Sequence, residues 1–270
     1  MTIDLPIARY RALLWILAFF VTIFSAVYQR KTGPSYAIQG EETFLGTSVQ
    51  FDLPRSQEVG SEAEVVVRTG DSAISGVIRY RRKNSDDGWT IIPMQRVGER
   101  LSARLPQQPP AGKLVYFVDI QNGSERMSLT GEKPVIIRYK GRVPVWILLP
   151  HILLMFGSML LANRTGLEAL DSCGKARCLL NWTVVLFFLG GLVFGPVMQK
   201  FAFGAFWTGF PFGTDLTDNK TLISAAGWII ALFMNRKGRD GRMWIVFAAC
   251  LMLVIYFVPH SLLGSELDYQ

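Results

Sequence analysis

Apolar residues in this chain gather into five runs, and one long polar stretch separates the first run from the others. The runs cover residues 12–28, 144–162, 179–198, 221–234 and 243–259. A helix needs about 20 apolar residues to cross a bilayer, and every run but the fourth approaches that length. As a helix, residues 221–234 would cover only about 21 Å, so this run begins earlier, lies in a thinned region or is re-entrant. The pattern predicts five transmembrane helices.

The polar stretch, residues 32–142, consists of short runs in which apolar and polar residues alternate. A period of two is typical of a strand with one buried face. It places Ile78 and Tyr80 on one face of a strand, and Arg79 and Arg81 on the other. Turn residues rich in Gly, Pro, Asn and Asp separate seven such runs: SVQFDLP, EAEVVVR, GVIRYRR, WTIIPM, RLSARLP, KLVYFVDIQ and PVIIRY. We predict an antiparallel β-sandwich.

Part of this stretch resembles a known type of module. Residues 78–123 read IRYRRKNSDDGWTIIPMQRVGERLSARLPQQPPAGKLVYFVDIQNG, with an xYRR strand, a Trp before a strand, an ARLP-like strand and a Y-x-V strand before a turn. In these features the segment resembles the fibronectin-type-III or immunoglobulin-like modules of bacterial envelope proteins. The resemblance covers well under half of the chain and implies a sandwich with a binding, spacing or assembly role.

These patterns predict a membrane protein of mixed α plus β class. Its first helix is expected to be an uncleaved signal anchor, because cleavage after Ala26 would place the large Phe24 at position −3. The expected parts are the anchor at 1–31, an extracytoplasmic sandwich at 32–142 between the first two helices, and a four-helix membrane domain at 143–270 with an aromatic outer loop at 199–220.

Basic residues predict the orientation, because Lys and Arg are enriched in short cytoplasmic loops. The N-terminus and two short loops carry them: Arg9 and Arg11; Arg164, Lys175 and Arg177; and Arg236, Lys237, Arg239 and Arg242. The end of the chain carries Glu266 and Asp268 but no Lys or Arg. We therefore expect a bacterial inner-membrane protein with a cytoplasmic N-terminus and with the sandwich and the C-terminus outside.

Composition narrows the class of protein further. Half of the residues are hydrophobic and 18% are charged, which excludes an intrinsically disordered chain. The net charge of +7 comes mostly from basic residues beside apolar runs, so we expect lipid and protein partners and no nucleic acid. Cys173 and Cys178 lack the CxxC spacing and Cys250 lies in an apolar run, so all three are expected to be reduced, structural thiols.

The chain has only two histidines, His151 and His260, and each follows a proline. Both fall in the expected outer half of the membrane, and an ionisable group at that depth is a hypothesis for a functional site. The two imidazoles are therefore candidate ligands of a haem b or of a metal ion. The alternative role is structural: the imidazole hydrogen-bonds a neighbouring helix or the backbone that Pro150 disturbs.

The expected outer loop after the third helix is dense in aromatic residues. They are interrupted by glycines and one proline: Phe201, Phe203, Phe206, Trp207, Phe210 and Phe212. One interpretation is an aromatic belt at the membrane surface. The other is a pocket, roofed by the sandwich, that binds a quinone, a lipid or a hydrophobic polymer, with Trp207 as a candidate contact. This loop and the ending PHSLLGSELDY are similar to bacterial multi-pass membrane proteins to which we attach no activity.

A polar cluster follows this loop. Asp218 or Thr217 is expected to cap the fourth helix. Alternatively, the acidic and basic side chains of the two outer segments gather with His260 and bind a cation or relay protons: Asp215, Asp218, Lys220, Glu266 and Asp268. In the third helix, Gly191 and Gly195, with Gly190 beside them, have the spacing that lets helices pack closely within the chain.

Three hypotheses for the function follow. The first is a non-catalytic membrane scaffold or accessory subunit whose sandwich binds a partner and whose helices dock on a larger complex. The second is an electron-transfer subunit that binds haem b or a quinone through His151, His260 and the aromatic loop. The third is a transporter or a lipid-handling component, which ranks last because the sequence contains no internal repeat and the middle of each apolar run is almost wholly apolar. The sequence also contains no nucleotide-binding or hydrolase motif, so we do not expect an enzyme.

Overall fold

The computed structural model describes residues 10–170, 176–236, 240–259, 264 and 267. By its internal contacts the chain forms two compact units. One unit is helical and contains residues 10–34, 143–201 and 205–259, and the other is built mainly of strands and contains residues 35–142 and 202–204. The chain is therefore of α plus β class, as the sequence predicts.

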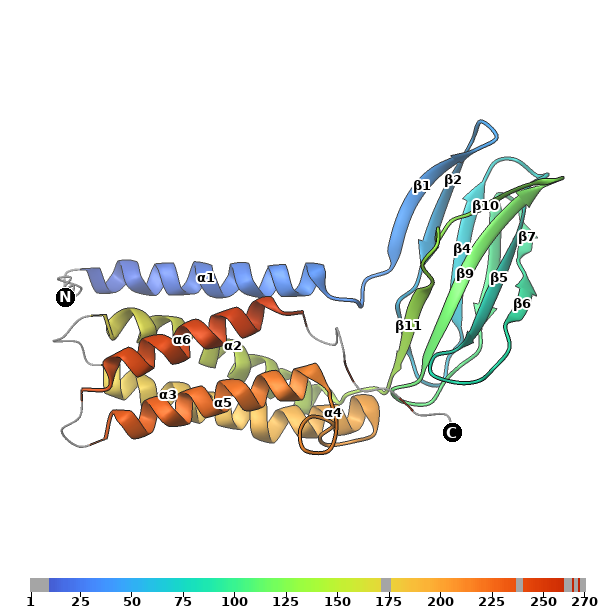
Figure 1. The fold of residues 1–270 in the computed structure, drawn as a ribbon. Helices are drawn as coiled ribbons and strands as arrows, with labels where there is room; N and C mark the ends of the chain where they lie inside the picture. The colour runs from blue at the N-terminus through green and yellow to red at the C-terminus, as the bar shows by residue number, and fades with distance from the viewer. Residues whose placement is uncertain (1–9, 171–175, 237–239, 260–263, 265–266, 268–270) are drawn as a thin grey trace. The chain divides into compact units, whose positions relative to one another are not determined.

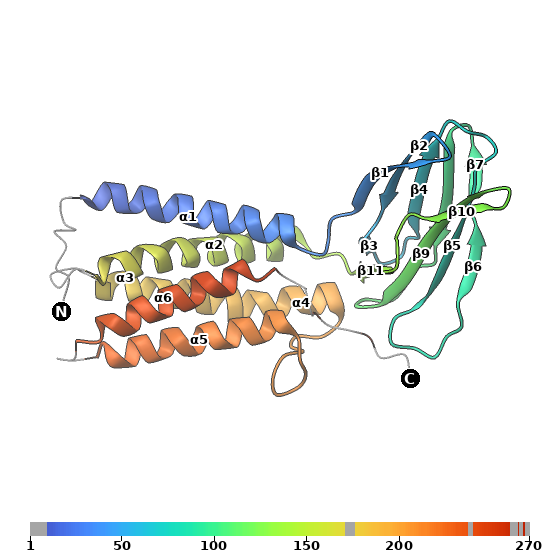
Figure 2. The same ribbon diagram turned by 45° about the horizontal axis from the view of Figure 1, so that its top comes forward.

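Two sheets form the strand-built unit (Figures 1 and 2). The first has the strand order β1-β2-β4-β8-β7, and the second has the order β3-β11-β9-β5-β6, with β10 paired to β9. Neighbouring strands are antiparallel except β3 and β11, which run parallel. The strands are β1 (Ile38–Phe44), β2 (Thr47–Leu53), β3 (Ser56–Glu58), β4 (Ala63–Thr69), β5 (Ser75–Arg82), β6 (Thr90–Pro93), β7 (Gln95–Val97), β8 (Arg100–Leu105), β9 (Lys113–Asn122), β10 (Glu125–Ser128) and β11 (Val135–Lys140).

One apolar core lies between the two sheets. Val65 and Leu101 of the first sheet and Val118 of the second are at most 1% exposed and belong to the same cluster. Two buried tyrosines each place a hydroxyl on a backbone carbonyl: Tyr116 donates to Pro54 at 2.8 Å, and Tyr139 donates to Pro106 at 2.9 Å. The core is therefore apolar, and its buried hydroxyl groups are hydrogen-bonded.

The alternating pattern is confirmed at residue level. Ile78 is fully buried and Tyr80 packs on the core, while Arg79 and Arg81 lie on the opposite face of β5. All seven predicted runs form strands: β2, β4, β5, β6, β8, β9 and β11. The sequence did not predict β1, β3, β7 and β10. Strand β1, IQGEETF, has a glycine and two consecutive glutamates in place of an alternating apolar series.

The helical unit contains α1 (Arg11–Thr32), α2 (Val145–Glu168), α5 (Leu216–Met234) and α6 (Arg242–Phe257). A further long helix, Ala176–Phe203, consists of α3 (Ala176–Phe187), a π-helical segment η2 (Phe188–Phe194) and α4 (Gly195–Phe203). Within the described residues, three helices are both long and apolar enough to cross a membrane: α1, α2 and the helix at 176–203. Helix α6 is apolar but has only 16 residues, and α5 begins with a polar turn.

Small residues let these helices pack closely. A Cβ added to Gly190 would lie 3.0 Å from the Cβ of Leu154, and one added to Gly191 would lie 3.0 Å from Cγ2 of Thr221. The prediction that Gly191 and Gly195, with Gly190 beside them, serve packing within the chain is therefore confirmed at Gly190 and Gly191, whose neighbours belong to α2 and α5. A Cβ at Gly195 would make only an ordinary contact, 3.8 Å from the ring of His151. Gly166 of α2 also lets two helices pack closely, because a Cβ there would lie 2.6 Å from that of Ala249 in α6.

Two details differ from the sequence predictions. Arg164 is not a loop residue: α2 continues to Glu168, and the two side chains form a buried ion pair at 2.5 Å. Asp215 caps α5 by accepting from the backbone N–H groups of Thr217 (2.7 Å) and Asp218 (3.4 Å). The prediction that Asp218 or Thr217 provides this cap is therefore wrong. The helix begins five residues before the apolar run. The apolar pattern did not reveal this first turn because most of its residues are polar.

Candidate functional sites

One carboxylate holds the loop between α4 and α5. Oδ2 of Asp218 accepts hydrogen bonds from the backbone N–H of Thr208 (2.6 Å) and of Gly209 (2.9 Å). It also accepts from Nε2 of Gln199 at 3.0 Å. The next residue, Asn219, accepts through Oδ1 from the backbone N–H of Phe210 at 2.7 Å. The first turn of α5 therefore fixes the conformation of the loop.

The loop displays aromatic rings on its outside. Phe206 is 57% exposed, Phe210 is 69% exposed and Phe212 is 81% exposed. Trp207 is only half-buried, and its Nε1 donates to the carbonyl of Phe210 at 3.0 Å, so the polar atom of the indole is already bonded within the loop. Exposed rings on a fixed loop favour an aromatic belt over an enclosed pocket.

Lys220, in the first turns of α5, is buried against the end of α6. Its Nζ donates to the carbonyls of Val258 at 2.8 Å and Pro259 at 3.5 Å. These carbonyls end a helix, where a cation is favourable. A cavity of about 30 Å³ beside Lys220, which Ser224 and Tyr256 also line, has room for about one water molecule.

His151 makes the contact that its structural role predicts. Its Nδ1 lies 2.9 Å from the carbonyl oxygen of Gly190 in the π-helical segment. A carbonyl can only accept, so Nδ1 carries the proton and donates. The same carbonyl accepts the backbone N–H of Gly195. In this tautomer Nε2 is left with its lone pair, which is also the arrangement of a histidine that binds a metal.

The proposed polar cluster is only partly described. Asp215, Asp218 and Lys220 lie together at the start of α5. His260, Glu266 and Asp268 lie outside the described residues, so their place in the cluster stays a prediction. In the part of the chain that the structure describes, no three His, Cys, Asp or Glu side chains are grouped to hold a metal ion.

The outer face of the second sheet carries a row of arginine and aromatic side chains. The guanidinium of Arg81 lies 5.0 Å from the ring centre of Trp89, and that of Arg79 lies 5.0 Å from the ring centre of Phe117. The two rings lie 5.5 Å apart. The strand register explains the row, because Arg79 of β5 stands directly opposite Phe117 of β9.

An acidic residue ends this row. The carboxylate of Asp119 is 4% exposed and accepts from Nε of Arg79 at 2.9 Å and from Nη2 of Arg126 at 2.7 Å. We name the set Arg79, Arg81, Trp89, Phe117, Asp119 and Arg126 the arginine–aromatic row. Its side chains hold one another in place, so the surface is fixed before any partner binds.

Further basic residues surround the row. Lys113 and Arg138 stand opposite each other in β9 and β11, and Lys140 follows on the same face. Burial lowers the pKa of Lys140 below its ordinary value, and the charge of Arg138 lowers that pKa further. The face therefore collects positive charge beside apolar side chains such as Ile91, which is 62% exposed.

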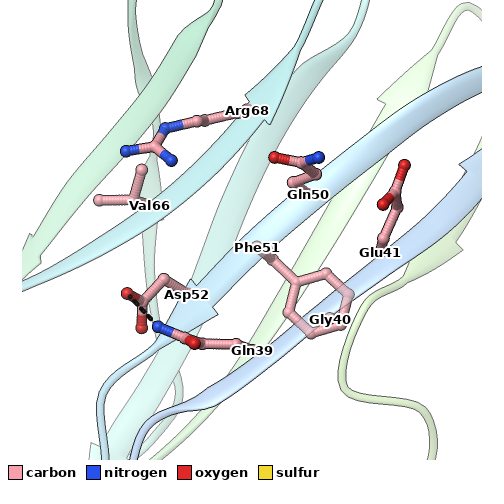
Figure 3. A pocket seen from close by; sticks show the side chains of 8 residues that line it. All are labelled: Gln39, Gly40, Glu41, Gln50, Phe51, Asp52, Val66 and Arg68. Atoms are coloured by element: carbon pink, nitrogen blue, oxygen red, sulfur yellow. Dashed lines mark hydrogen bonds between the residues drawn. The ribbon is translucent and has the colours of Figure 1, made fainter.

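The first sheet has a different outer surface. A hollow of about 520 Å³ lies over β1, β2 and β4, and Figure 3 shows its lining, which includes Glu41, Gln50, Asp52 and Arg68. Gln39 donates to Asp52 at 3.2 Å across the strand pair. Apart from Phe51 and Val66 the lining side chains are polar, and this lining has one aromatic ring where the second sheet has a row of paired arginine and aromatic side chains.

The sequence pattern contains the signal for the arginine–aromatic row, although alternation by itself predicts only the strands. Alternation puts Arg79 and Arg81 on one face of β5, and Phe117 and Asp119 on one face of β9. The pattern does not reveal that β5 and β9 pair with each other, because β6, β7 and β8 lie between them along the chain. No protein-family model and no curated protein matches the chain.

Proposed function

We propose that this protein is a non-catalytic integral membrane scaffold or accessory subunit whose sandwich binds a partner protein. The observation that carries the proposal is the arginine–aromatic row. Trp, Phe and Arg are enriched in protein interfaces, and Trp and Arg are the residues that most often dominate binding energy. The row concentrates both types on one fixed face of a sheet.

The proposal places all five helices in the bacterial inner membrane. Three of them have the required length and hydropathy. Basic residues support the orientation: Nη2 of Arg177 donates to the carbonyl of Asn235 at 2.5 Å, which brings the start of α3 to the end of α5. Arg236 lies in the connection between α5 and α6, and Arg242 is the first residue of α6. In this orientation that end is cytoplasmic, and the sandwich is outside.

The strand order supports an immunoglobulin-like or fibronectin-type-III-like module. Constant-type immunoglobulin domains have strands A, B, E and D in one sheet and C, F and G in the other. Lettered in chain order, β2, β4, β8 and β7 take the places of A, B, E and D, and β5, β9 and β11 take those of C, F and G. Such modules often serve binding, which agrees with an exposed row of anchors.

The sharpest test is site-specific photo-crosslinking of the full chain in its native membrane. A photoreactive residue at Ile91, beside the row, is expected to yield a discrete crosslinked protein. The matched control is Gln50, an exposed position on the outer face of the first sheet. Trp89→Ala should reduce the yield at position 91 several-fold. Equal yields at the two positions, or no adduct at either, would refute binding through the row.

A second candidate function is the binding of haem b or a quinone. The observation that favours it is the hydrogen bond from Nδ1 of His151 to Gly190, because it leaves Nε2 able to bind a metal. A haem would need a second ligand, for which His260 is the candidate. An absorption spectrum of the detergent-purified chain, before and after dithionite, tests haem binding. A Soret band that shifts on reduction and is lost in His151→Ala supports haem, and a spectrum with only the protein band removes haem.

A further inference from the structure

From the end of α4 to the residue before the cap Asp215, the loop between α4 and α5 has an apolar surface and no charged side chain. Between Lys200 and Asp215 the sequence reads FAFGAFWTGFPFGT, without a charged residue. Three of its rings are exposed, those of Phe206 (57%), Phe210 (69%) and Phe212 (81%). Exposed aromatic rings gathered on one short loop mark a surface that binds something apolar.

The backbone of this loop is already hydrogen-bonded. The N–H groups of Thr208 and Gly209 donate to Asp218, and that of Phe210 donates to Asn219. The N–H groups of residues 212 and 213 both donate to the carbonyl of Gly209 at 2.9 Å, and residue 211 is a proline, which has none. From 208 to 213, therefore, no N–H group needs water.

This property decides what the loop contacts. Irregular backbone is costly in an apolar environment because its N–H groups lose their water partners. A loop that has bonded all these donors internally avoids that cost. Aromatic rings on such a loop are suited to the zone between lipid headgroups and hydrocarbon, where aromatic residues concentrate.

The neighbouring helices are short on the same side. The apolar part of α5, residues 221–234, rises about 21 Å, and α6, with 16 residues, rises about 24 Å, against a hydrocarbon thickness of about 30 Å. Lys220 bonds the carbonyl of Val258, so the end of α6 lies at the level of the start of α5, next to the loop. The bilayer must thin there or be filled by other apolar groups.

We infer that the loop at 204–215 inserts Phe206, Phe210 and Phe212 into the outer leaflet and fills the space that the short α5 and α6 leave, with Asp218 as the latch that fixes its shape. This inference rests on the proposed membrane location. The partner is the lipid itself, because the loop joins two helices whose outer surfaces face lipid in the same proposal.

Depth-dependent quenching tests the insertion in the full chain. The protein is reconstituted into vesicles of phosphatidylcholine and phosphatidylglycerol, in a background of Cys173→Ser, Cys178→Ser and Cys250→Ala. One environment-sensitive fluorophore is attached through Phe212→Cys. Doxyl groups at carbon 5 of the lipid chains are expected to quench it at least threefold more than doxyl groups at carbon 12.

Two further labelled positions separate the possible failures. Phe20→Cys, on a 64% exposed position of α1, must be quenched if the helices span the bilayer, and Val97→Cys, on a 75% exposed position of the sandwich, must not be. If positions 20 and 212 are both unquenched, the membrane proposal fails. If position 20 is quenched but position 212 behaves like position 97, only the insertion is refuted, and the loop faces water or a protein.

The latch has its own test. Asp218→Ala removes the acceptor of two loop N–H groups and should lower the carbon-5 to carbon-12 quenching ratio at position 212 by at least twofold. Asp240→Ala is the matched control, because this carboxylate is 73% exposed and pairs with Arg242 at 3.4 Å, at the end of α6 away from the loop. An unchanged ratio in Asp218→Ala would refute the latch, and an equal fall in Asp240→Ala would show that the effect is not specific to the loop.

Discussion

Asp119 is the residue of the arginine–aromatic row whose change has the most predictable effect on stability. Asp119→Asn keeps the shape of the side chain and removes its charge. Two bonds are affected, from Arg79 at 2.9 Å and from Arg126 at 2.7 Å. A hydrogen bond to a charged group contributes about 1 kcal/mol more than a neutral one. The carboxylate is 4% exposed, but the arginines are 35% and 53% exposed and regain water. The net loss should therefore be about 1–2 kcal/mol.

The assay is thermal and urea unfolding of the segment 32–142, which we expect to fold alone because its core lies within it. Trp89 is the only tryptophan of this segment, so its fluorescence reports on the row itself. A loss of 1–2 kcal/mol should lower Tm by roughly 5–10 °C in a module of this size. The row should also loosen, which shifts the emission of Trp89 to the red in the folded state.

A control shows whether the effect belongs to the buried pair. Glu62→Gln removes a carboxylate that is 53% exposed and lies 3.8 Å from Arg104, so the midpoint should stay unchanged. Our reasoning would be refuted if Asp119→Asn unfolded at the wild-type midpoint, or if the two substitutions were equally costly. Failure of the unsubstituted segment to fold would instead contradict the assigned extent of the module.

Three further outcomes are expected. Burial raises the pKa of Tyr116 above its ordinary value of about 10, so the folded sandwich favours the neutral phenol. The stability that this contributes is full below about pH 10 and falls as the pH rises above 10. Alkaline unfolding followed at 295 nm should show that Tyr116→Phe loses part of this pH dependence. Gly166→Ala should destabilise the detergent-purified chain by about 1–3 kcal/mol in thermal unfolding, since its Cβ would lie 2.6 Å from that of Ala249, whereas Gly157→Ala, 3.4 Å from a leucine methyl, should be tolerated. Lys220→Met should increase hydrogen exchange at the end of α6, because two terminal carbonyls lose their donor; unchanged exchange there would contradict the role of Lys220.

The sandwich was the most predictable part, because period-two alternation directly reflects one buried face. The run around Ile78 alternates, and Ile78 lies in the core. The run around Val118 is apolar from 114 to 118, but every second residue of it, Leu114, Tyr116 and Val118, lies in the core. Strand β1 escaped prediction because its residues are mostly exposed and its register is set by pairing with β2, including the contact of Gly40 with the ring of Phe51. Edge strands of this kind depend on tertiary pairing more than on pattern.

The candidate sites were less predictable, because their residues come from elements that are distant in sequence. A cap within α5 was expected at Asp218 from proximity to the apolar run, but Asp215 starts the helix earlier and frees Asp218 to bond the loop. Arg164 looked like a loop residue because it is charged. Its pairing with Glu168 one turn later neutralises the charge inside α2, which hydropathy alone does not reveal.

The π-helical segment at Phe188–Phe194 also sets the rotational phase of the helix that contains it. A π-turn holds one residue more than an α-turn, and one residue corresponds to about 100° of rotation. Upstream of it Leu180 and Phe187 face the bundle core, and downstream Gln199 faces Asp218. If the same residues formed an uninterrupted α-helix, Gln199 would lie about 100° further round the axis and would face away from the loop. The extra residue thus lets one continuous helix serve the core along its first half and a different partner along its second.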